Sequence, residues 1–141
     1  MSIKLVDMAH YGRYFSYDER KYPIWWYDCK TESPIFVEDL LRKCSIDDAS
    51  KIDYVALKCE GFIPFFQLDI LSLELEYADC KFDANENKKL QSLGEEEFDY
   101  SFMRTIDLKR MRKDWYFYEL NALSKEAENW AKENGISYDK E

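Results

Sequence analysis

The segment of residues 68–83, LDILSLELEYADCKFD, constrains the fold most, because apolar and acidic residues alternate along it. Alternation with a period of two is typical of a strand that has one buried and one exposed face. Leu73, Leu75 and Tyr77 would then face a core, while Glu74 and Glu76 would point outward together. We therefore predict a strand over residues 72–82 with an acidic outer face.

Other segments also show strand signals. The break SYDERK, residues 16–21, is expected to be a turn between two aromatic strands. In the segment EEEFDYSF, alternation would place Phe98, Tyr100 and Phe102 on one face of a strand. Two further strands are expected over residues 3–8 and 51–59.

Helix signals are fewer. A Ser-Pro pair at residues 33–34 is typical of a helix start, and the sequence Asp-Ala-Asn-Glu at residues 83–86 matches a capping box. Gly135 follows an apolar stripe of helical spacing and is a stop signal. The predicted helices span residues 34–44, 84–93 and 121–134.

Together these elements predict the fold class. Residues 105–119 fit either a helix or a strand, and the remaining signals favour strands. We predict an α+β fold in which two to three helices pack on a mainly antiparallel sheet. A chain of 141 residues fits a single globular domain, residues 1–141.

The charge of the chain is concentrated in residues 60–100. That window holds eleven acidic residues and three lysines, which is −8 of the net charge of −9. Nucleic acids and anionic membranes are therefore poor partners for it, whereas a basic protein is a good one. An acidic face of this kind either keeps a protein soluble or binds a cationic partner, and both alternatives stay open at this point.

No motif for catalysis or metal binding is present. His10 is the only histidine, and the four cysteines form no CxxC pair, so neither a nucleophilic site nor a zinc site is indicated. We predict a protein that is not an enzyme and needs no cofactor or metal. We expect a cytoplasmic protein on three grounds. Its cysteines are expected to be free, no apolar run is long enough to span a membrane, and the N-terminal segment has no signal-peptide core.

Aromatic residues gather near the N-terminus, where eight of residues 11–27 are Tyr, Phe or Trp. Most of these rings are expected in the core. Trp25, Trp26 and Tyr27 are adjacent, so they cannot all face one side of a strand. At least one of them is expected at a surface rim, where it could anchor a partner.

In general character the chain resembles small acidic immunity proteins that neutralise bacterial toxins, such as those of contact-dependent growth inhibition systems. The shared features are short length, an ELELEY-type acidic segment, many Tyr and Trp residues and no catalytic motif. The resemblance implies a non-enzymatic inhibitor that covers the active site of a basic toxin or nuclease domain. The residues expected to contact the partner are Trp25, Trp26, Tyr27, Glu74, Glu76, Asp79, Asp83, Glu95, Glu96, Glu97 and Asp99. The alternative is a DNA-mimicking inhibitor from a phage or mobile element, of the anti-restriction or anti-CRISPR type.

Overall fold

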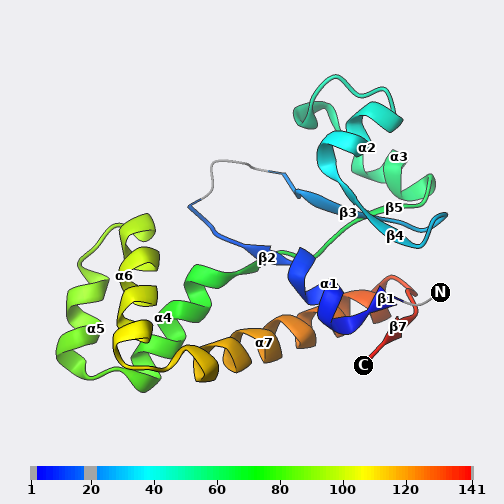
Figure 1. The fold of residues 1–141 in the computed structure, drawn as a ribbon. Coiled ribbons are helices and arrows are strands. Elements are labelled where there is room, and N and C mark those ends of the chain that lie inside the picture. The colour runs from blue at the N-terminus through cyan, green and yellow to red at the C-terminus, as the bar shows by residue number, and fades with distance from the viewer. Residues whose placement is uncertain (1–2, 18–21, 141) are drawn as a thin grey trace.

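Helices dominate the computed structural model, which describes residues 3–17 and 22–140 (Figure 1). Its described part contains seven α-helices, one 3-10 helix and only small sheets of two or three strands. The predicted mainly antiparallel sheet with two to three helices is therefore wrong. The α-helices are α1 (Leu5–Tyr11), α2 (Val37–Lys43), α3 (Tyr54–Cys59), α4 (Ile70–Lys81), α5 (Ala84–Gln91), α6 (Glu95–Leu108) and α7 (Arg112–Glu133), and the 3-10 helix is Ala49–Lys51.

The strands form three separate sheets. In the largest, β3 (Trp25–Asp28) lies between β4 (Ser33–Phe36) and β5 (Phe62–Pro64), and both pairs are antiparallel. The other two sheets are two-residue parallel pairs that join distant parts of the chain. These pairs are β1 (Ile3–Lys4) with β7 (Tyr138–Asp139), and β2 (Arg13–Tyr14) with β6 (Leu68–Asp69).

Helix α7 connects the parts of the molecule (Figure 1). Its first half carries Trp115 and Leu123 into a core shared with α4, α5 and α6. Its second half carries Ala127 and Trp130 into a second core, which also contains residues of α1 and β3. A third core lies between the three-stranded sheet and helices α2 and α3.

The predicted strand over residues 72–82 is in fact helix α4. The alternation of Leu71, Leu73, Leu75 and Tyr77 fits a strand, but leucine and glutamate are strong helix formers and the segment has few β-branched residues. The Asp69 carboxylate caps the helix by accepting a hydrogen bond from the Leu71 amide at 3.2 Å. The buried positions follow helical spacing and are Ile70, Leu71, Leu73, Glu74, Tyr77 and Ala78.

Three other predicted strands are also wrong for the most part. Residues 98–102 belong to α6, which buries Phe98 and Phe102 at helical spacing and leaves Tyr100 73% exposed. Residues 51–59 form the end of the 3-10 helix and then α3, whose first turn is capped by Asp53. Of residues 3–8, only the first two are in a strand. The predicted turn at residues 16–21 falls largely outside the described residues.

Two predicted helices are confirmed in their main features. The Asp83 carboxylate accepts from the Glu86 amide at 2.8 Å and the Glu86 carboxylate accepts from the Asp83 amide at 3.1 Å, so the capping box begins α5 as expected. The helix predicted over residues 121–134 is the C-terminal half of α7, and Gly135 follows it with a φ of 66°. The helix predicted from Pro34 begins later, at Val37, because residues 33–36 pair with β3.

Candidate functional site

The predicted acidic face of residues 72–82 does not exist as one surface. Because α4 is a helix, Glu74 points into the protein and is 1% exposed, while Glu76 and Asp79 lie on the outside. Both outer carboxylates have local partners. The Tyr118 hydroxyl hydrogen-bonds Glu76, and the Asn87 side chain donates to Asp79 at 3.2 Å.

The other predicted acidic residues have two different roles. Asp83 is exposed and caps α5, so its carboxylate has a structural function. Glu95, Glu96 and Glu97 form the exposed first turn of α6, and none of them makes an ion pair with a described residue. Negative charge in this turn stabilises the helix, because it interacts favourably with the positive N-terminal end of the helix dipole. The N-cap residue Gly94 has no side chain that could accept from the first amide groups.

The three aromatic residues of β3 do not form an exposed rim. Trp26 is 0% exposed in the core beneath α2 and α3, and the exposed Tyr54 stacks on it. Tyr27 is also buried and meets Trp130 edge to face in the opposite core. Both faces of this strand are covered, so successive side chains are buried on opposite sides. Trp25 is half-buried, which leaves it as the one partly accessible ring of the three.

Helix α6 has a second stripe that faces away from its core residues. Positions 96, 100, 103 and 107 follow helical spacing and line a hollow of about 730 Å³ together with Tyr17. Tyr100 and Leu108 border this hollow and are 73% and 76% exposed. The stripe therefore combines large exposed apolar groups with the carboxylates of Glu96, Asp99 and Asp107. We call the surface formed by these residues of the helix the α6 stripe; they are Glu96, Asp99, Tyr100, Met103, Arg104, Asp107 and Leu108.

A second hollow of about 780 Å³ adjoins the α6 stripe, and we call it the Glu74 pocket. The two hollows share Asp99 and Met103. The walls of the Glu74 pocket are largely apolar, and its polar groups come from β2, α4, α6 and α7. Its lining residues are Arg13, Phe15, Glu74, Asp99, Met103, Arg112, Lys113, Trp115, Tyr116 and Glu119.

Hydrogen bonds and ion pairs hold most charged groups of the Glu74 pocket. The Arg13 guanidinium donates to Glu119 at 2.9 and 3.4 Å, and Arg112 donates twice to Asp107 at 2.8 Å. The Tyr17 hydroxyl donates to Asp99 at 2.9 Å. Oε1 of Glu74 is the exception, because this buried atom has no hydrogen-bonding partner among the described residues.

The protonation of Glu74 follows from these surroundings. Burial raises its pKa to about 10, and the neighbouring carboxylates Asp99 and Glu119 act in the same direction, against a smaller opposite effect of Arg13. Glu74 is therefore neutral at pH 7. In its neutral form the Glu74 carboxyl can donate to the neighbouring Asp99, because two carboxyls share a hydrogen bond only when one of them carries a proton. Burial and then Asp99 also raise the pKa of Tyr17 to about 12.

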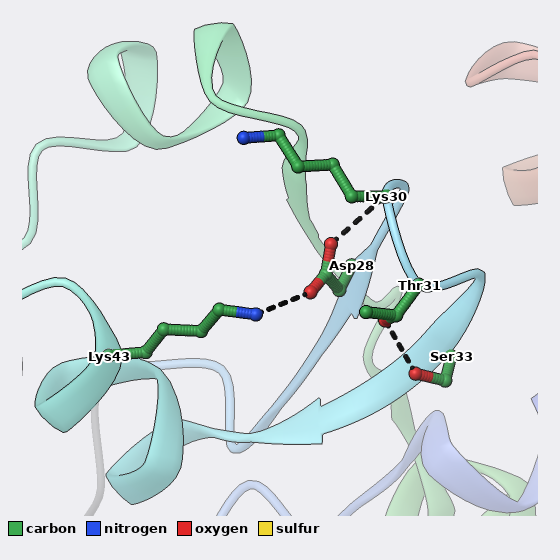
Figure 2. Close-up of polar contacts among 5 residues, drawn as sticks. All are labelled: Asp28, Lys30, Thr31, Ser33 and Lys43. Carbon is green, nitrogen blue, oxygen red and sulfur yellow. Dashed lines mark hydrogen bonds and ion pairs between the residues drawn. The ribbon is translucent and has the colours of Figure 1, made fainter.

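Asp28 is the other buried carboxyl in the described part of the chain (Figure 2). It accepts hydrogen bonds from the Lys43 ammonium at 3.0 Å and from the Lys30 amide at 2.9 Å. Burial alone would raise its pKa, but these two donors outweigh burial and lower it. In the same turn the hydroxyls of Thr31 and Ser33 lie 2.7 Å apart. Asp28 thus ties the β3–β4 hairpin to α2, and its partners account for its burial.

Sequence reasoning missed the Glu74 pocket, although one signal was present. Ile70, Glu74 and Tyr77 are spaced as one face of a helix, so a helical interpretation would have placed Glu74 with the buried residues. Arg13 and Glu119 are 106 positions apart in the chain, and no local pattern connects them. Of the residues predicted to contact a partner, the structure brings Glu74, Asp99 and Glu96 to the two adjoining hollows.

Comparisons with protein-family models, curated proteins and solved structures find no match for the chain. Within residues 3–17 and 22–140, no group of three or more His, Cys, Asp or Glu side chains is placed to hold a metal ion. None of the described helices is both long and apolar enough to cross a membrane.

Proposed function

We propose that the protein is a non-enzymatic inhibitor that binds a basic protein through the α6 stripe. The observation that carries this proposal is the exposure of Tyr100 and Leu108 beside the carboxylates of the same stripe. Exposed apolar groups of this size add nothing to the folded core, and large apolar residues within a polar surround are typical of binding surfaces. Tyr100 supplies the kind of rigid aromatic side chain that often dominates the energy of an interface.

The charges near the stripe favour a cationic partner. The first turn of α6 carries three glutamates without ion pairs to described residues, and Asp99 lies one turn further along. Such a group attracts a positively charged surface over a distance of roughly 10 Å at physiological salt. Steering of this kind raises the association rate more than the final affinity. Arg104 lies in the C-terminal half of the stripe, so the cationic surface of the partner would face the N-terminal half of α6.

An immunity protein is the inhibitor class that we propose. The active site of a nuclease toxin must attract nucleic acid and is therefore basic, so an acidic and aromatic surface can cover it. Such a toxin acts on nucleic acid inside the cell, which would place this protein in the cytoplasm. The resemblance in composition to acidic immunity proteins supports the same class.

Capture of the partner tests this proposal. The tagged chain is incubated with lysate of the native cells at low and high salt, and retained proteins are quantified by mass spectrometry. We expect one basic protein at near-equal stoichiometry that survives high salt and whose activity is lost when the chain is added to it. The matched control is Glu126→Lys with Glu133→Lys, two exposed positions on α7 outside the stripe, which should capture the same protein.

The capture experiment also separates the proposal from charge mimicry of DNA. A DNA mimic would retain many DNA-binding proteins, and these would dissociate as salt screens the carboxylates. That result would contradict a single cognate partner. Failure to inhibit the captured protein would contradict the inhibitor proposal even if binding is tight.

A further inference from the structure

The α6 stripe carries opposite charges at its two ends. Glu96 and Asp99 lie in its N-terminal half, beside the other two glutamates of the first turn. Asp99 accepts a hydrogen bond from the neutral Tyr17 hydroxyl, so its negative charge stays uncompensated by that partner. The N-terminal half of the stripe is therefore a negative surface.

Two cations lie at the other end of the stripe. Arg104 lines the hollow of the stripe itself, and Lys113 of α7 lines the adjoining Glu74 pocket. Both are exposed, and neither makes an ion pair with a described residue. The carboxylate in this half of the stripe, Asp107, is already held by two hydrogen bonds from Arg112. The C-terminal end therefore keeps two positive charges without a carboxylate partner.

Apolar side chains lie between the two charged ends. Tyr100 and Met103 occupy the middle of the stripe, and Tyr100 is one of the most exposed aromatic residues of the described chain. A surface with this order of charges is complementary to itself when it is turned end to end, because each negative half then meets a positive half. Contacts between identical patches of two copies have this two-fold form.

We propose that the α6 stripe pairs with the α6 stripe of a second copy of the chain, with the two helices antiparallel across a two-fold axis. An axis that passes between Tyr100 and Met103 brings these residues of both copies together, and thioether groups pack favourably on aromatic rings. Glu96 and Asp99 of each copy then lie opposite Arg104 and Lys113 of the other. Every contact occurs twice, once on each side of the axis.

The pairing is expected to be weak and to depend on concentration. With 14 residues, α6 is about 21 Å long, and a contact along one such helix is at the small end of protein interfaces. The net charge of −9 opposes association, but physiological salt screens charges that are more than about 8 Å apart, so the pairs at the contact outweigh it. The same stripe is proposed above to bind a basic partner, which would compete with self-pairing. The isolated chain tests self-pairing without that partner.

Sedimentation equilibrium of the isolated chain at physiological salt is the first measurement. The average mass should rise with concentration, from micromolar to millimolar, from the mass of one chain toward that of two and no further, because a two-fold contact is closed. A mass that stays at one chain throughout this range, or that grows beyond two chains, would overturn the proposal.

Two double variants each reverse one end of the stripe at exposed positions. Glu96→Lys with Glu97→Lys makes both ends positive, and Arg104→Glu with Lys113→Glu makes both ends negative. Each should self-associate at least about tenfold more weakly than the original chain, because like charges face each other across the axis. The matched control is the exposed pair Glu126→Lys with Glu133→Lys, which changes the net charge as much as the first variant does and should pair like the original chain.

Mixing the two reversed variants separates a true contact from a loss of folding. In a mixed dimer the new lysines of one variant face the new glutamates of the other, and the two unchanged ends face each other with opposite charge. The mixture should therefore form dimers at least as well as the original chain, as measured by sedimentation with one variant fluorescently labelled. Mixed variants that stay monomeric, or single variants that pair like the original chain, would overturn the proposal.

The variant with the reversed basic end also keeps this proposal apart from the proposed function. Arg104→Glu with Lys113→Glu retains the glutamates that would attract the basic partner, so it should still capture that partner while it remains monomeric. An original chain that captures a partner but never dimerises would overturn self-pairing alone.

Discussion

Helices α4 and α6 share a sequence pattern, but most of the large apolar side chains of α4 are buried, whereas α6 also carries large apolar side chains that are exposed. Each mixes acidic with large apolar residues, and strand-like alternation occurs in both. In α4, Glu74 is buried beside Asp99, and the two outer carboxylates have neutral partners, Tyr118 for Glu76 and Asn87 for Asp79. The glutamates in the first turn of α6 are exposed, and exposed apolar groups follow them on the outer stripe of that helix.

The contrast shows that acidic composition alone does not locate a binding surface. What distinguishes the two helices is the exposure of their apolar groups, since Tyr100 and Leu108 of α6 are 73% and 76% exposed and Leu75 of α4 is 38% exposed. In addition, the three glutamates that begin α6 make no ion pair with a described residue. By that criterion we propose the α6 stripe as the docking surface and assign α4 to the framework that supports it.

Placing a lysine at position 74 should have the largest effect. Glu74→Lys forces a longer side chain into a fully buried position, and we expect a cost of about 3–5 kcal/mol from overpacking and from desolvation of the ammonium, which Asp99 offsets only in part. Urea unfolding should show a loss of that size in the free energy of unfolding. Glu96→Lys on α6 is the control and should change stability by less than about 1 kcal/mol, because the position is exposed. An equal loss of unfolding free energy in both variants would contradict the assignment of a buried role to Glu74 and an exposed role to Glu96.

Stability should also depend on pH through Glu74, with a definite sign. The pKa of Glu74 is about 10 in the folded protein and near 4.5 when it is exposed, so between these values the folded state binds more protons than the unfolded state. Stability therefore falls as pH rises through this window, by at most about 1.4 kcal/mol per pH unit from this group. Glu74→Gln should remove that slope and become more stable than the original chain at pH 8–9. A parallel pH dependence of the two proteins in thermal unfolding would refute the assignment.

Asp28 provides the contrasting case of a buried carboxyl that is fully partnered. Asp28→Asn weakens the hydrogen bond from Lys43, so the free energy of unfolding should fall by about 1–3 kcal/mol. Because burial is outweighed by its donors and the pKa of Asp28 is lowered, its contribution is present near neutral pH and is lost as pH falls below about 4. Urea unfolding at pH 7 and pH 3 measures both effects. A larger loss for the variant at pH 3 than at pH 7 would contradict this role.

The smallest of these effects is expected at Asp83. Asp83→Ala removes the cap of α5 and should cost about 1 kcal/mol in the free energy of unfolding. Because Asp83 has a structural role, capture of the partner should be unchanged, and Asp83→Asn should recover most of the stability. If Asp83→Ala captured less partner without a loss of stability, Asp83 would belong to the binding surface and its structural role would be contradicted.

The elements that could be predicted from sequence are those with local signals. The capping box at residues 83–86 and the glycine at 135 are read directly from residue types, and they mark a true helix start and end. Helix α4 is predicted as a strand because the spacing of Leu71, Leu73 and Tyr77 fits both the two-residue period of a strand and the 3.6-residue period of a helix. Packing of this segment against α6 and α7 decides between the two. The Glu74 pocket could not be predicted, because pairing of β2 with β6 and the long path of α7 bring Arg13 and Glu119 to Glu74.

Quantitative capture of the partner should separate two double variants of matched charge. Glu96→Lys with Glu97→Lys alters α6, and Glu76→Lys with Asp79→Lys alters α4, each pair lying at exposed positions. We predict that the α6 variant loses at least about 90% of the captured partner, because its new lysines repel a cationic surface, while the α4 variant retains it. Loss of capture by the α4 variant with full capture by the α6 variant would contradict the account.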